Sequence, residues 1–205
     1  GEDAAAKARL ASMISPDDPS VRELYERSKL LPKLVQSISL AEKHVQSGNT
    51  AAAILSYEKA LKIDSRHKPT QETLNILKQQ KRENDFYAQM SMGFNALDEN
   101  RFGEAQTAFR TAKDIDSSRA EAQQALEQLF DRQSQYRTDK ALKTADQLEK
   151  MEEWQKAVDV YDKLIAEDVS LVEPKIRRLT ASLRAQIDRQ IEEILKDPLK
   201  LSSPT

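Results

Sequence analysis

The chain has 205 residues, of which 39% are hydrophobic, 32% are charged and only 5% are aromatic. This composition is too apolar for a disordered chain, and too poor in aromatic residues for one thick globular core. Lys and Arg (32) nearly balance Asp and Glu (34), so a net charge of −2 provides no field that would attract nucleic acid.

Cysteine is absent from the sequence. Its absence excludes disulfides, thiolate metal sites and a cysteine nucleophile, and leaves both a bacterial periplasmic and a cytoplasmic location open. No apolar run approaches the ~20 residues of a membrane span and no signal peptide is visible, so we expect no membrane insertion. The chain opens at Gly1 and stops at Thr205 without a closing cap, and we expect it to be a fragment of a longer protein.

Proline and glycine usage indicates an all-α fold. Only four glycines occur, and no proline lies between Pro69 and Pro174. Apolar residues recur at helical spacing, and no window alternates with a period of two residues over the length of a strand. Because proline breaks helices, this long gap permits helices throughout the middle of the chain.

In chain order, the sequence predicts a helix near 3–14 and a second near 20–31 that ends at Pro32. Helical pairs follow at about 33–47 with 50–63, at 86–98 with 102–115, and at 138–150 with 154–166. Segments 69–85 and 119–137 lead into the next pair through polar junctions, 78–85 and 131–139, that contain no glycine or proline. We therefore predict continuous helices of about 30 residues, ~45 Å long, with a kink in these polar junctions as the alternative. Pro198 is expected to end the last helix.

Three stretches of the chain repeat at a spacing of 52 residues. The aligned positions are Ala53, Ala105 and Ala157; Tyr57, Phe109 and Tyr161; Ala60, Ala112 and Leu164; and Asp64, Asp116 and Asp168. A fixed period marks a solenoid, in which each unit buries its apolar face against its neighbours.

The helical pairs resemble the tetratricopeptide repeat (TPR), a helix-turn-helix unit of 34 residues. Small residues stand where its two helices cross closely: Ala41, Gly93 and Ala145 in the first helix, and the three aligned alanines in the second. Leu164 departs from the pattern, and Ser65 and Ser117 replace the family's proline. The resemblance implies three TPR-like units, at 34–67, 86–119 and 138–171, within residues 34–189. A helical pair (1–33) precedes them, and the end of the last helix and a C-terminal tail (190–205) follow. We expect an all-α, TPR-like α-α solenoid with long connecting helices.

TPR domains bind peptides or helices in a groove lined by the first helix of each pair. In the middle unit that helix carries an apolar strip at helical spacing, namely Tyr87, Met90, Phe94 and Leu97, which could hold an amphipathic partner helix. The alternative is that the strip is core. Lys143 is the one residue that fits the family's carboxylate clamp, and we do not expect such a clamp. Trp154 is predicted to pack between paired helices.

Catalytic and metal-binding signals are weak. Asp98–Gly103 lacks the ligands of a calcium loop, and neither His44 nor His67 has a second ligand at a supporting spacing. Neither a phosphate-binding glycine loop nor a nucleophile motif occurs. We expect no cofactor, no metal and no enzymatic activity. The cationic positions from Lys175 to Arg189 are interpreted as a solvated face, with a docking surface for an acidic partner as the alternative.

Two functional hypotheses follow. The first is a non-catalytic scaffold that binds a partner peptide or helix within a larger assembly. The second is a structural spacer or oligomerisation module of a multidomain protein, in which an apolar strip pairs two copies as a homodimer.

Overall fold

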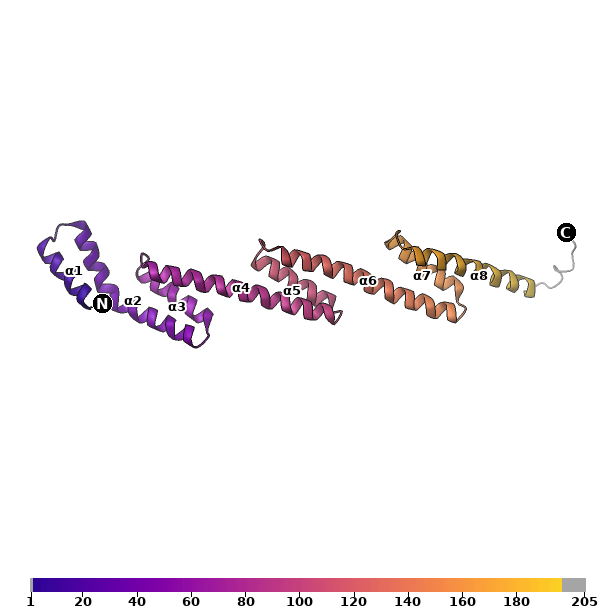
Figure 1. The fold of residues 1–205 in the computed structure, drawn as a ribbon, viewed down its shortest axis with the longest axis horizontal. Coiled ribbons are helices and arrows are strands. Elements are labelled where there is room, and N and C mark those ends of the chain that lie inside the picture. Colours follow the sequence, from indigo (N-terminus) through magenta and orange to yellow (C-terminus); the bar gives the residue numbers. More distant parts are fainter. Residues whose placement is uncertain (1, 197–205) are drawn as a thin grey trace. The chain divides into compact units, whose positions relative to one another are not determined.

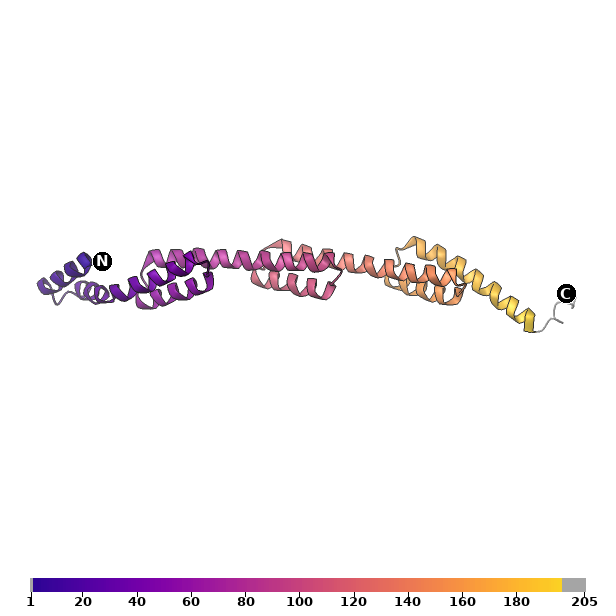
Figure 2. The same ribbon diagram turned by 90° about the horizontal axis from the view of Figure 1, so that it is seen from below.

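The computed structural model describes residues 2–196, which form eight α-helices and no strand (Figures 1 and 2). The helices are α1 (Glu2–Ile14), α2 (Pro19–Gln46), α3 (Thr50–Ile63), α4 (Lys68–Asp98), α5 (Phe102–Ile115), α6 (Ala120–Lys150), α7 (Trp154–Glu167) and α8 (Val172–Lys196). The all-α prediction is confirmed. Within this part of the chain, none of the helices combines the length and the apolar character that crossing a membrane requires. The predicted helix end at Pro198 and the predicted tail lie outside the described residues.

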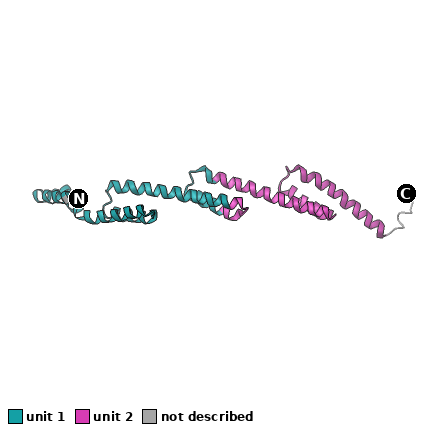
Figure 3. Cartoon of the chain, turned by 60° about the horizontal axis from the view of Figure 1, so that its bottom comes forward, with its two compact units in different colours: residues 1–95, 107–122 teal, residues 96–106, 123–205 magenta. Residues whose placement is uncertain are grey.

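The chain divides into two compact units (Figure 3). Unit 1 contains Gly1–Asn95 and Thr107–Ala122, and unit 2 contains Ala96–Gln106 and Gln123–Thr205. In unit 1, α2 packs against both α1 and α3, and in unit 2, α7 packs against α8. The boundaries between the units fall within α4, α5 and α6.

Helix α2 runs through Pro32, so the predicted helix end at Pro32 is wrong. Proline in a helix interior removes a hydrogen bond and costs ~3 kcal/mol. Contacts on both sides of Pro32 hold α2 in place. Before it, Nη2 of Arg27 donates to Oδ2 of Asp64 at 2.8 Å, and after it Ala41 packs in a core cluster with Tyr57. This tertiary packing outweighs the local cost.

The two long helices predicted across the polar junctions are present, because α4 and α6 each form one helix of 31 residues. Side chains four residues apart support the junctions on the helix surface. Nε2 of Gln79 donates to Oε1 of Glu83 at 2.8 Å, and Lys81 pairs with Asp85 at 2.5 Å. Such pairs add a few tenths of a kcal/mol each to an exposed helix.

The three hairpins turn at residues with positive φ. Gly48, Asn100 and Glu152 stand one period apart, with φ of 73°, 55° and 58°. Glycine adopts this left-handed conformation freely and asparagine tolerates it, whereas glutamate has no such preference. The same turn is therefore made by three different residues, and Glu152 makes it at the greatest local cost.

A second turn repeats after the second helix of each hairpin. One carboxylate oxygen accepts a hydrogen bond from the backbone N–H two residues further on, at 3.1 Å for Asp64, 3.2 Å for Asp116 and 2.8 Å for Asp168. These Asx turns occupy the predicted breaks between helices. The pKa of Asp64 lies below its ordinary value because Arg27 bonds to it, and the pKa values of Asp116 and Asp168 are lowered mainly by the hydroxyls of Ser118 and Ser170.

Each unit contains a core cluster in which an aromatic ring packs against small residues. The cluster of unit 1 is Ala41, Ala53, Tyr57, Leu74 and Leu77, and that of unit 2 is Ala145, Ala157, Val158, Tyr161 and Ala181. Four of the five positions correspond one to one at twice the 52-residue period. Trp154 packs against the cluster of unit 2, as predicted from the sequence.

Candidate functional site

The four residues of the predicted apolar strip on α4 divide into two kinds. Tyr87 and Phe94 are 58% and 39% exposed, whereas Met90 and Leu97 are buried, at 7% and 8%. The burial of Met90 follows from the period, because Ile38 and Leu142 occupy the same position and pack against the two core clusters. As a surface for a partner, the strip is therefore reduced to Tyr87 and Phe94.

The exposed aromatic rings of this strip already have neighbours in unit 1. The guanidinium of Arg119 lies 5.2 Å from the ring centre of Tyr87 and 4.8 Å from that of Phe86. Phe94 packs edge-on against Phe109 with 5.0 Å between ring centres. Lys143, the fifth predicted site residue, is exposed on α6 in unit 2. That these residues bind a partner stays a prediction.

A polar cluster in unit 2 was not anticipated from the sequence. Nη2 of Arg177 donates to Oε2 of Glu149 at 2.6 Å and to Oδ1 of Asp146 at 3.2 Å, while the hydroxyl of Tyr161 donates to Oε1 of Glu149 at 2.7 Å. Burial and the bond to Glu149 raise the pKa of Tyr161 well above its ordinary value, and Glu149 raises that of Arg177. The phenol and the guanidinium therefore keep their protons near neutral pH. The cluster joins the end of α6 to α7 and α8 through Glu149, Tyr161 and Arg177.

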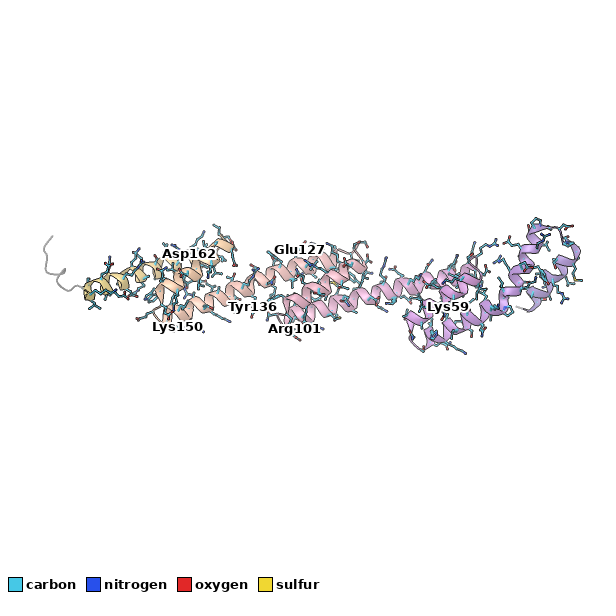
Figure 4. The ribbon with its side chains drawn as sticks, turned by 180° about the vertical axis from the view of Figure 1, so that it is seen from behind. Lys59, Arg101, Glu127, Tyr136, Lys150 and Asp162 are labelled. Atoms are coloured by element: carbon cyan, nitrogen blue, oxygen red, sulfur yellow. The ribbon has the colours of Figure 1, made fainter. Side chains whose placement is uncertain are left out.

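Two cations of the basic run on α8, Arg177 and Arg178, are paired within their own unit. Arg177 belongs to the cluster just described, and Arg178 pairs with Asp162 of α7, which is labelled in Figure 4. The pKa of Asp168 is lowered mainly by its hydrogen bonds from Ser170, and the charge of Lys175 adds only a smaller effect. Arg177 and Arg178 therefore already have acidic partners in the same chain. This makes the alternative of a docking surface for an acidic partner less favoured.

Helix α8 carries a row of six exposed aliphatic side chains, which we call the α8 stripe. Each is between 47% and 67% exposed: Val172, Ile176, Leu179, Leu183, Ile187 and Ile191. Their spacing of three and four residues places them along one side of the helix. Large exposed apolar patches mark interaction sites in folded proteins.

The packed side of α8 lies opposite the stripe. Its buried residues are Pro174, Ala181 and Ala185, and at ~100° per residue they fall roughly half a turn away from the stripe. Small residues thus bring α8 close to its neighbours, while the larger aliphatic side chains point away from them. Figures 1 and 2 both show the C-terminal part of α8 extending past α7.

The six positions of the α8 stripe can be compared with the equivalent positions in the two preceding copies of the repeat. One period earlier its six positions are Ala120, Gln124, Glu127, Asp131, Gln135 and Asp139, and two periods earlier they are Lys68, Glu72, Asn75, Gln79, Glu83 and Tyr87. The same side of α4 and α6 is thus mainly polar. The fold does not require aliphatic residues here, and this comparison between copies is the sequence signal that could have revealed the stripe.

Among residues 2–196, no three His, Asp or Glu side chains are grouped so as to hold a metal ion. Comparisons of the chain with protein-family models, with curated proteins and with solved structures give no match.

Proposed function

We propose that this chain is a non-catalytic protein-interaction scaffold built from TPR-like hairpins, and that it binds a partner helix within a larger assembly. The observation that carries the proposal is the α8 stripe, an aliphatic surface on a side of the repeat that is polar in the two preceding copies. A row of residues at i, i+3, i+4 and i+7 is the pattern by which one helix recognises another.

Two further observations support the TPR-like part of the proposal. The small residues Ala53, Ala105 and Ala157 are fully buried, as are Phe109 and Tyr161, with Tyr57 nearly so. A buried small residue followed four positions later by a buried aromatic ring is the pattern on which the resemblance rests. Its recurrence in all three hairpins favours a common helix-turn-helix unit.

Site-specific photo-cross-linking in cells that make the protein tests the proposal. A benzophenone amino acid replaces Leu183 in the stripe, Phe94 in the predicted strip, or Asp131, which occupies the position of Leu183 one period earlier. We expect a discrete cross-linked polypeptide from position 183 and none from position 131. An adduct from position 94 alone would move the binding surface to α4. The absence of adducts at both 183 and 94 would contradict the scaffold function.

A further inference from the structure

We propose that the partner of the α8 stripe is the α8 stripe of a second copy of this chain, paired antiparallel. The inference rests on the proposed function, because it identifies the helix that the scaffold binds. Three observations support it: the stripe lies on one side of α8, charge is unevenly distributed along that helix, and the exposed apolar area is large enough for a dimer.

The stripe stays on one side of the helix over its full length. Val172, Leu183 and the partly exposed Ile194 are separated by 11 residues each, which corresponds to about three turns of an α-helix. At ~100° per residue the six stripe residues occupy a sector of about 120°, across which the run from Leu179 to Ile191 moves steadily. Two such helices can therefore pack side by side through the middle of the stripe.

Charge along α8 favours the antiparallel direction. The first half of α8 has a positive excess, since Lys175 and Arg184 outnumber Glu173 beside the stripe. The second half has a negative excess, because Asp188, Glu192 and Glu193 outnumber Arg189 and Lys196. Parallel pairing would place like charges side by side, and antiparallel pairing places the basic half of each helix against the acidic half of the other. The helix dipoles favour the same direction.

One register satisfies the apolar and the charged residues together. When Leu183 lies opposite Ile187 of the second copy, Leu179 lies opposite Ile191. Beside the stripe, Lys175 then faces Glu193 of the second copy to within about one turn. Because the pairing is two-fold symmetric, each of these contacts occurs twice.

The area is sufficient for a reversible dimer. In this register the paired aliphatic side chains run from Ile176 to Ile194 and are 37% to 61% exposed, which gives on the order of 500 Å² per copy, near the upper end for a single folded chain. Pairing two stripes buries on the order of 1,000 Å², at the lower limit for a specific interface. We therefore expect self-association in the micromolar range.

Sedimentation equilibrium at micromolar concentrations tests the pairing. We expect a dimer for the unaltered chain, and at least a tenfold weaker association for Ile187→Glu. The matched control is Gln135→Glu, which places the same charge at the equivalent position of α6 and should leave association unchanged. Circular dichroism checks that both variants keep their helix content, as expected for substitutions at exposed positions. A monomer at all concentrations, or equal association of the two variants, would overturn the inference.

Disulfide trapping tests the direction, since the chain has no cysteine of its own. A mixture of Lys175→Cys and Glu193→Cys chains should form the mixed disulfide, and neither variant alone should form a disulfide dimer through these positions. A 175–175 disulfide would show parallel pairing and overturn the antiparallel inference. If the chain is monomeric but Leu183 still cross-links in cells to a different polypeptide, self-pairing is refuted and the scaffold function stands.

Discussion

Among Gly48, Gly93 and Gly103, Gly93 on α4 is the glycine at which an added methyl group should lower stability by steric contact. It aligns with Ala41 and Ala145, so the repeat accepts alanine at this crossing in the other two hairpins. At position 93 an added Cβ would lie 2.3, 2.5 and 2.9 Å from three ring atoms of Phe109, which is fully buried. Phe94, packed edge-on against that ring, limits its movement.

The expected cost of Gly93→Ala comes from two opposing effects. Overpacking a buried site costs about 1–3 kcal/mol, and contacts this short place the substitution near the upper end of that range. Alanine is favoured over glycine in a helix interior by about 1 kcal/mol, which offsets part of the cost. We expect a net local destabilisation of about 2 kcal/mol in unit 1.

Hydrogen exchange followed by mass spectrometry is the suitable assay, because repeat proteins can unfold region by region. Peptides from 86–95 and 107–115 should exchange faster in Gly93→Ala, and peptides from α7 should serve as an internal reference. The matched control is Gly103→Ala, where nothing lies within 4 Å of the added Cβ, so exchange should be unchanged or slower. Protection in Gly93→Ala equal to or greater than that of the unaltered chain would refute the steric argument.

The remaining predictions concern charged groups. Arg177→Met should destabilise unit 2 by about 1–2 kcal/mol, because Glu149 loses its charged partner. Arg178→Met, at a more exposed pair, should lower stability less than Arg177→Met does. Equal urea midpoints for the two variants would show that the cluster around Arg177 contributes no more to stability than the exposed pair of Arg178. Asp64→Asn should cost about 1 kcal/mol at pH 6, after allowance for solvent screening, by weakening the bond to Arg27. Because the folded pKa of Asp64 lies below 3.8, the stability it contributes is complete above that value and is lost as pH falls through the folded pKa. The difference between Asp64→Asn and the unaltered chain should therefore shrink towards pH 2 in thermal melts, and a constant difference would contradict the assignment.

Most of the helix pattern could be predicted from the sequence, since it depends on local signals. The short second helices match their expected bounds closely, and the polar junctions without glycine or proline indicated the continuous helices α4 and α6. Pro32 was misjudged because its effect is set by tertiary contacts: Arg27 and Ala41 anchor α2 on both sides of the proline. The local cost of proline in a helix, ~3 kcal/mol, could not be compared with these packing contacts from the sequence, because they form only in the folded chain.

The surface was harder to predict than the fold, because helical spacing alone does not distinguish a packed side from a free one. Tyr87, Met90, Phe94 and Leu97 share one spacing, yet two of them are buried. Alignment of the copies separates these cases. Met90 aligns with aliphatic residues that pack in both other hairpins, whereas Leu183 aligns with Asp131 and Gln79. An aliphatic residue that replaces polar ones at the same position is therefore not required by the fold, and we propose binding as its role in the α8 stripe.

The Asx turns at Asp64, Asp116 and Asp168 also bear on how such a chain can change its length in evolution. Each turn has the same hydrogen bond two residues on, and each follows a helix of 14 residues. A recombination event that joins the segment ending at Asp64 to the segment beginning after Asp116 removes one full period and leaves an intact turn at the junction. Duplication between the same points adds a period in the same way. Recombination at these turns can therefore add or remove a whole hairpin while the remaining helices keep their lengths and spacing.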